Sequence, residues 1–76
     1  MNDNIIEQEI RGDMITLGQL IKVLNLVSSG AEVKQYLHGE SVFVNGDADD
    51  RRGRKLYPGD LIKLGDGTVV RLTSQP

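Results

Sequence analysis

The dipeptide Asn45-Gly46 constrains the fold more than any other feature of this sequence. It follows Val42-Phe43-Val44, where the valines share one side of an extended chain and the phenylalanine takes the other. Both central residues of a type I′ turn need positive φ, which asparagine and glycine tolerate, so we predict a β-hairpin here. Residues 47–50 are acidic, and we expect regular strand pairing to resume only near residues 54–56.

Two further turns complete a small antiparallel sheet. Residues 57–60, Tyr-Pro-Gly-Asp, place proline and glycine where a type II turn needs them. We predict a strand over residues 61–64, a turn at Gly65-Asp66-Gly67 and an antiparallel return over residues 68–72. The chain is expected to fray from Thr73, with 74–76 as a C-terminal tail.

The first predicted helix runs from Leu17 to residue 24 or 25. Thr16 and Gln19 have capping-box spacing. The apolar residues that follow at helical spacing are Leu17, Leu20, Ile21 and Leu24.

A second helix is predicted to begin after Ser29, which has capping-box spacing to Glu32. Gly39 is expected to end it in a left-handed conformation. Its apolar residues are Val33, Tyr36 and Leu37. Both helices are too short to persist alone, so we expect them to pack on the sheet.

The excess acidity of the chain lies near its N-terminus. Residues 1–13 carry four acidic residues and one arginine, whereas residues 14–76 carry eight Lys or Arg and seven Asp or Glu. Isoleucines alternate with glutamates around Glu7, which is consistent with either an edge strand or an ordered arm. We therefore divide the chain into an acidic arm or edge strand (1–13), a folded domain (14–73) and the tail.

Composition excludes several classes of protein. With 76 residues the chain forms one domain, and with no cysteine it has neither disulfides nor thiolate metal sites. No apolar run approaches the roughly 20 residues that span a bilayer, and the N-terminus lacks the pattern of a signal peptide. We expect a cytoplasmic monomer with no membrane contact.

The order of these elements resembles the S4-like RNA-binding domain, and in so short a chain the stand-alone bacterial proteins of that family. The matching residues are Leu17, Ile21, Ser29, Lys34, Leu37, Gly39, Val42, Val44, Asn45, Gly46, Gly59 and Asp60. The resemblance implies an α+β, S4-like (alpha-L) fold in which two short helices pack on a small antiparallel sheet. It also implies a module that binds RNA, with ribosomal or transfer RNA as the target class.

The basic segment 51–55 is the candidate RNA site. It places four cations around Gly53, and guanidinium groups clamp phosphates or stack on bases. The resemblance adds Lys34, since S4-like domains present the second helix to RNA. The family's usual arginines are absent at Thr16 and Gly30, so the RNA hypothesis depends on Lys34, Arg51, Arg52, Arg54 and Lys55.

Two alternatives remain open at this stage. The basic segment could instead balance the acidic residues 47–50 as a solvated loop. The chain could also be a protein-interaction adaptor that docks a partner through the N-terminal arm or an open sheet edge, without RNA contact.

Chemistry-bearing patterns are otherwise lacking. Asp47-Ala48-Asp49 begins like a calcium loop, but Arg52 and Pro58 occupy the positions where that loop needs glycine and glutamate. His38 is the only histidine, so a metal site there is not expected. No residues suggest a nucleophile with its base, and we expect a protein that is not an enzyme and needs no cofactor.

Overall fold

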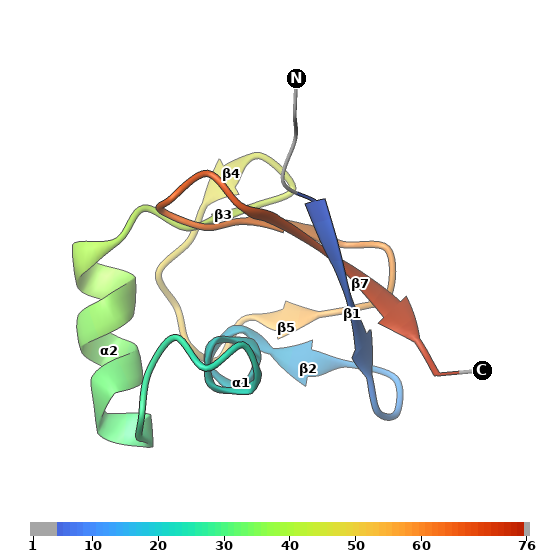
Figure 1. Cartoon of the computed structure of the whole chain (residues 1–76), viewed down its shortest axis with the longest axis horizontal. Helices are drawn as coiled ribbons and strands as arrows, with labels where there is room; N and C mark the ends of the chain where they lie inside the picture. Colours follow the sequence, from blue (N-terminus) through green and yellow to red (C-terminus); the bar gives the residue numbers. More distant parts are fainter. Residues whose placement is uncertain (1–4, 76) are drawn as a thin grey trace.

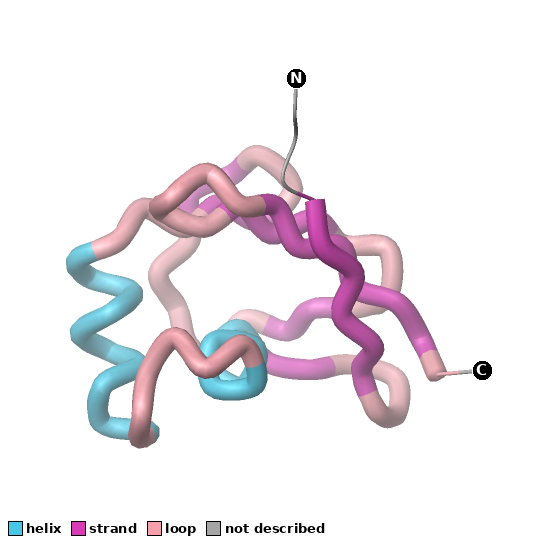
Figure 2. Tube along the Cα trace, viewed as in Figure 1, coloured by secondary structure: helices cyan, strands magenta, loops and turns pink. Residues whose placement is uncertain are grey.

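The computed structural model describes residues 5–75 as two short helices packed against two small sheets (Figure 1). In chain order the elements are β1 (Ile5–Ile10), β2 (Ile15–Thr16), α1 (Leu17–Val23), α2 (Gly30–Gly39), β3 (Phe43–Val44), β4 (Asp47–Ala48), β5 (Lys55–Leu56), β6 (Leu61–Lys63) and β7 (Val69–Ser74). Figure 2 shows both helices on one side of the molecule and the larger sheet arching over the other. The predicted α+β class is confirmed.

The larger sheet has five strands in the order β1-β7-β6-β3-β4, and β2 pairs with β5 in a separate sheet. All pairs are antiparallel except β1 with β7, which run parallel from Ile5 opposite Val69 to Ile10 opposite Ser74. This parallel pair is an addition to the antiparallel sheet that the sequence predicted. It also orders the chain through Ser74, so the expectation that the chain frays from Thr73 was wrong.

The type I′ hairpin is confirmed, since φ is 51° at Asn45 and 90° at Gly46. Strand pairing resumes at once, with Val44 opposite Asp47, and not near residues 54–56 as expected. A type I′ turn sends the chain straight back along the first strand, and the exposed Asp47 keeps its charge in solvent. The later segment, β5, pairs with Ile15–Thr16 instead.

The capping box of α1 is confirmed. The Gln19 backbone N–H donates to the Thr16 hydroxyl at 3.2 Å, and the Thr16 N–H donates to the Gln19 side-chain oxygen at 3.0 Å. These reciprocal bonds fix where the chain leaves β2 and enters the helix.

The termini of α2 differ from the prediction. The Ser29 hydroxyl caps nothing, and the Glu32 carboxylate accepts the N–H of Ser28 at 2.7 Å. Gly39 is the last helical residue and has no positive φ. The chain leaves through Glu40 in an extended conformation, and the Glu40 N–H completes the last helical bond to the Tyr36 carbonyl at 2.9 Å, so no left-handed residue is needed.

The apolar faces of both helices form one core together with buried residues of the larger sheet and with Leu56 of β5. The fully or nearly fully buried residues are Ile10, Leu17, Leu20, Ile21, Val33, Leu37, Val42, Val44, Leu56, Ile62, Leu64, Val70 and Leu72. This core mixes residues from every element except β2 and β4, so neither helix has to be stable alone.

The N-terminal segment joins the sheet as β1, with an ion pair between Glu7 and Arg71 across the parallel pair. Residues 1–4 of the predicted arm and residue 76 of the tail lie outside the described residues, and the proposed domain boundary after residue 13 stays a prediction. None of the helices formed by residues 5–75 has the length and apolar character to cross a membrane.

Asn45 and Asp60 connect the two turns that the sequence singled out. The Asn45 side-chain amide donates to one Asp60 oxygen at 3.1 Å, and its carbonyl accepts the Leu61 N–H at 2.9 Å. The other Asp60 oxygen accepts the Tyr57 N–H at 2.8 Å within the type II turn, where Gly59 has a φ of 96°. The hairpin and the start of β6 are therefore positioned by one shared hydrogen-bond network.

This network predicts energetic coupling between the two turns. Asn45→Ala and Asp60→Ala should each lower the free energy of unfolding by about 1–2 kcal/mol, and the double variant should lose about 0.5–1 kcal/mol less than the sum. Urea titrations of the four proteins measure this. Pairing Asn45→Ala with Asp66→Ala is the control, because Asp66 caps Thr68 in another turn and its effect should simply add. Additive losses for Asn45 and Asp60 would contradict the network.

Candidate nucleic-acid interface

Asp49 divides the cations of the basic segment into two groups. Its carboxylate binds the Arg51 guanidinium at 2.9 Å and that of Arg54 at 2.7 Å, and it also accepts the Arg51 backbone N–H at 2.9 Å. The Asp49 side chain is only 5% exposed. The hydrogen bonds from Arg51 hold the pKa of Asp49 well below its usual range, and the bond from Arg54 has a smaller effect in the same direction. Burial acts in the opposite direction, since it raises the pKa.

Two of the predicted site residues are therefore engaged within the protein. Arg51 and Arg54 balance the charge of an acidic residue from 47–50, as one alternative for the basic segment proposed. Their guanidinium groups hold the loop around Asp49. Among the residues that the structure describes, no side-chain hydrogen bond or ion pair engages Arg52, Lys34 or Lys55.

The same segment is held by its backbone on the first turn of α1. The Leu17 N–H donates to the Arg54 carbonyl and the Gly18 N–H to the Arg52 carbonyl, both at 2.9 Å. The Thr16 hydroxyl accepts the N–H of Gln19, so the first three N–H groups of the helix all have acceptors. Helix and basic segment thus fix each other, and Figure 1 shows the chain after β4 running down past both helices to β5.

Gly18 permits this close approach. A Cβ atom at position 18 would lie 3.1 Å from the Arg52 Cβ, 3.2 Å from the Arg52 carbonyl oxygen and 3.3 Å from a Val33 methyl group. Those distances are shorter than ordinary van der Waals contact, so only glycine lets the loop rest on the helix undisturbed.

Arg52 lies between two shallow depressions on the surface. The first, here the Lys34 depression, is lined by Lys34, Leu37, His38, Asp50 and Arg52. The second, here the Lys22 depression, is lined by Thr16, Gly18, Gln19, Lys22, Gly30, Val33, Arg52 and Gly53. The structure thus brings Arg52 together with Lys34 on one side and Lys22 on the other.

Lys55 belongs to neither depression. It lies exposed on β5 opposite Thr16, in the smaller sheet. The five predicted residues therefore occupy three settings: Arg52 with Lys34, Arg51 with Arg54 on Asp49, and Lys55 apart.

Lys22 and His38 line these depressions but are not among the residues that the sequence predicted for the site. His38 lies four residues after Lys34 on α2, so helical spacing already indicated that they share a face. Lys22 lies four residues after Gly18 on α1, but only the docking of the basic segment on Gly18 brings it near Arg52. No sequence signal reports that contact.

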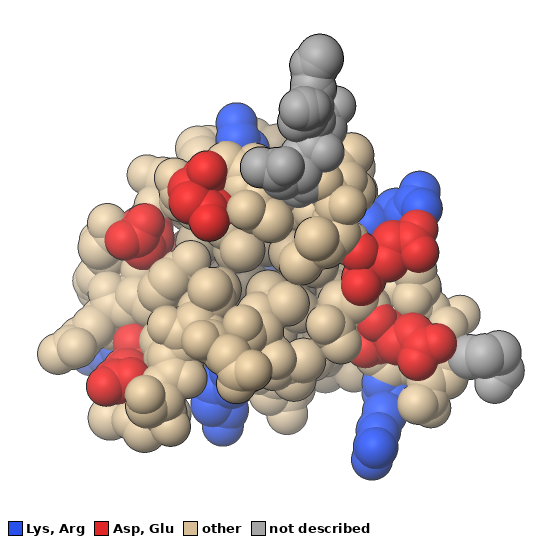
Figure 3. Space-filling view, in the orientation of Figure 1, with Lys and Arg blue, Asp and Glu red and all other residues tan. Residues whose placement is uncertain are grey.

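On the face of the molecule drawn in Figure 3, positive charge does not form one broad patch. Figure 3 shows acidic side chains grouped over β1 and near α2, with Lys and Arg side chains scattered at the margin of that face. This agrees with a net charge of −2. The two depressions place Lys34 and Lys22 on either side of Arg52, so the candidate interface is a local row of cations around Arg52.

Comparison with known proteins identifies the fold. A family model described as the S4 domain matches residues 8–72, which is most of the chain. The chain belongs to the S4 domain family. A relative of this S4 domain protein, the "Probable ribosome maturation protein RlbA" of Bacillus subtilis (strain 168), is 46% identical over 52 residues, or 68% of this chain and 73% of the relative. The S4-like interpretation of the sequence is thereby confirmed.

The buried carboxylate predicts a pH-dependent loss of stability. At neutral pH Asp49→Asn should lower the free energy of unfolding of the S4 domain by about 1–2 kcal/mol, because the hydrogen bonds from Arg51 and Arg54 lose their charged acceptor. The folded-state pKa of Asp49 is lowered, so its stabilisation is complete above the ordinary aspartate pKa and disappears as the pH falls toward the lowered value. Urea titrations from neutral pH to below about pH 4 should show the two proteins converging. Asp47→Asn, at an exposed position, is the control. If the difference in unfolding free energy between Asp49→Asn and the native protein stayed constant with pH, the role of Asp49 would be contradicted.

A second prediction tests the docking of the basic segment on α1. Gly18→Ala should destabilise the S4 domain by about 1–3 kcal/mol, because the added methyl group pushes Arg52 from the helix. Gly30→Ala, also within a helix but with no atom within 4 Å of its Cβ, should be neutral or slightly stabilising. Thermal unfolding of both variants measures this, and equal behaviour would show that the contact is not tight.

Proposed function

We propose that this S4 domain protein is a non-enzymatic RNA-binding module that recognises structured RNA, with ribosomal RNA as the target class. The observation that carries the proposal is the setting of Arg52. Its backbone is tied to α1, its side chain is exposed and has no ion-pair partner among residues 5–75, and Lys34 and Lys22 flank it.

Arg52 is suited to a phosphate of the RNA backbone. A guanidinium group offers two parallel donors to phosphate oxygens, and a fixed backbone lowers the entropy lost on binding. Lys34 and Lys22 then act as point charges for neighbouring phosphates, and His38 adds a polar ring beside Lys34. Asp50, in the same depression, disfavours a phosphate at that position and so limits where the backbone runs.

Arg51 and Arg54 contribute to RNA binding indirectly in this proposal. Their bonds to Asp49 shape the loop from which Arg52 projects. Lys55 serves as an outer contact that adds attraction without positioning. So few free cations favour recognition of RNA shape and backbone over readout of base sequence.

Ribosomal RNA is preferred as the target because of the relative in Bacillus subtilis. Its name assigns that protein to ribosome maturation, and the matched 52 residues are 68% of this chain. Transfer RNA, the other class implied by the family resemblance, has no such support.

Filter-binding titrations against ribosomal RNA fragments test the proposal. Arg52→Gln should weaken binding about tenfold and Lys34→Gln less, while Lys63→Gln, an exposed lysine on β6 outside both depressions, should bind as the native protein does. For roughly three neutralised phosphates, log affinity should fall with log salt at a slope of about −2. Each of the first two variants should reduce that slope by roughly 0.7–0.9. Binding that is insensitive to salt, or equal loss in all three variants, would contradict the proposal.

A protein-interaction adaptor is the second candidate, and the position of β1 favours it. β1 is a terminal strand of the five-stranded sheet, and Ile5 and Ile6 are 53% and 44% exposed. An unpaired edge with apolar side chains can accept a strand from a partner. In a pull-down treated with nuclease, RNA-bridged partners are released and a partner held on β1 remains.

A further inference from the structure

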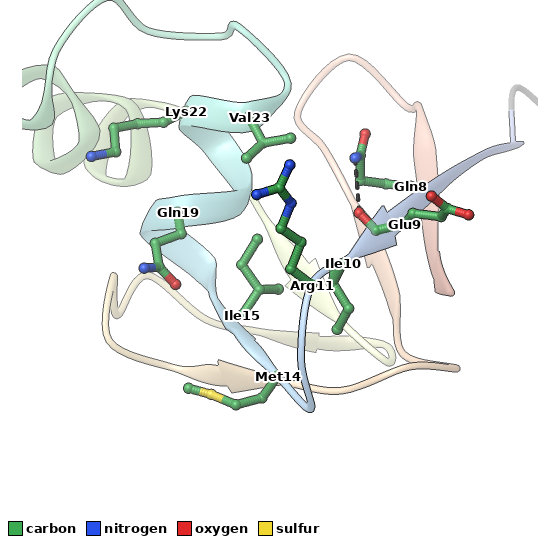
Figure 4. A pocket seen from close by; sticks show the side chains of 9 residues that line it. All are labelled: Gln8, Glu9, Ile10, Arg11, Met14, Ile15, Gln19, Lys22 and Val23. Atoms are coloured by element: carbon green, nitrogen blue, oxygen red, sulfur yellow. Dashed lines mark hydrogen bonds between the residues drawn. The ribbon is translucent and has the colours of Figure 1, made fainter. Parts of the chain in front are cut away.

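An open apolar pocket lies between the end of β1 and α1. Its volume is about 570 Å³, and its walls include Arg11, Met14, Ile15, Gln19, Lys22 and Val23. Figure 4 shows Arg11 reaching from the chain after β1 toward Val23 on the helix, with Ile15 below. Val23 is 50% exposed although it is the last apolar residue of α1.

This pocket continues the row of cations around Arg52. Gln19 and Lys22 line both the pocket and the Lys22 depression, and Arg52 lines both the Lys22 and the Lys34 depressions. A single path therefore runs from Lys34 past Arg52 and Lys22 to Arg11. Among the described residues, none of these four cations has an ion-pair partner.

We propose that the pocket receives an unpaired nucleobase of the RNA whose backbone is bound at Arg52. The inference rests on the proposed function and narrows its ligand to structured RNA with an unstacked nucleotide, as in a bulge or a loop. Sites for single-stranded nucleotides combine a cationic track for the phosphates with an apolar or planar surface for the base. Here the path from Lys34 to Arg11 provides the cationic track, and the pocket provides the surface for the base.

The groups around the pocket match the parts of one nucleotide. Val23 and Ile15 offer apolar contact to a base, and the Arg11 guanidinium provides a plane on which a base can stack. The Gln19 side-chain oxygen is occupied by the Thr16 N–H, which leaves its amide N–H groups for an acceptor on the base edge.

Charge sets the direction in which the nucleotide enters. Lys22 lies on the side that faces Arg52, whereas Glu9 lies across the pocket from Lys22 (Figure 4). A phosphate is attracted to Lys22 and repelled by Glu9, whose carboxylate points away from the pocket in Figure 4. The pocket therefore takes the base at its far side and the phosphate near Lys22.

The volume supports a small ligand group of this kind. Pockets for small molecules measure roughly 300–1,000 Å³ and combine apolar walls with a few polar groups, and this pocket has both properties.

The test uses the full chain and two short RNA hairpins. The bulged hairpin carries one unpaired adenine, which is replaced by a fluorescent adenine analogue. The paired hairpin is otherwise the same but lacks this unpaired nucleotide. The native protein should bind the bulged hairpin at least about fivefold more tightly than the paired one and quench the analogue. Val23→Ser should abolish that preference and leave binding of the paired hairpin unchanged. Leu26→Ser is the matched control, since Leu26 is 37% exposed and lies outside the pocket.

Arg11→Gln provides a second variant at an exposed position, in case Val23→Ser disturbs the helix, and it should also reduce the preference. Equal affinity of the native protein for both hairpins, or equal behaviour of Val23→Ser and Leu26→Ser, overturns the pocket proposal. If Arg52→Gln still weakens binding of both hairpins in that case, the proposed function stands and only the base pocket fails. If Arg52→Gln has no effect on either hairpin, both proposals fail.

Discussion

The two backbone hydrogen bonds between the first turn of α1 and the carbonyls of Arg52 and Arg54 are the contact on which the rest of the surface depends. A helix begins with N–H groups that lack partners within it, and here a distant segment supplies the acceptors. The bonded residues are more than thirty positions apart in the sequence, yet helix and segment each complete the other. Because Gly18 allows the two backbones to approach closely, the backbone at position 52 is held against the first turn of α1.

Within the basic segment 51–55, some arginines pair with a carboxylate of the protein and another is exposed without such a partner. Arg51 and Arg54 satisfy an almost fully buried carboxylate, which needs them because an unpaired charge in that position would be costly. Arg52, between them in sequence, has its carbonyl on the helix and its side chain exposed. The backbone of the basic segment is therefore held in place by α1, and Arg52 is the arginine of the segment whose guanidinium has no ion-pair partner among the described residues.

Most of the fold follows from local rules that the sequence displays. The positive φ of Asn45 and Gly46, the type II turn at residues 57–60 and the capping box of α1 depend on near neighbours, so patterns of two to four residues predict them. The pairing of β1 with β7 and of β2 with β5 joins segments that lie far apart in the sequence, and short apolar runs do not specify their partners. The candidate site shows the same limit: the sequence identified the cluster of cations, but which of them Asp49 binds depends on tertiary contacts.

If the proposed interface binds RNA, its affinity through phosphates alone is limited by the net charge of −2 and by the size of the row, which has four cations without an ion-pair partner among residues 5–75. Electrostatic attraction of that size is weak at physiological salt, and it falls off within about 8 Å. A module built in this way gains selectivity by adding contacts that only a correctly shaped RNA can satisfy. The apolar pocket beyond Lys22 offers such a contact, since burial of a base is insensitive to salt and requires a nucleotide that is already unpaired. The proposed RNA binding gives the weak charge of the chain and the half-exposed Val23 one explanation, because in that proposal affinity is divided between a small cationic track and a single apolar site.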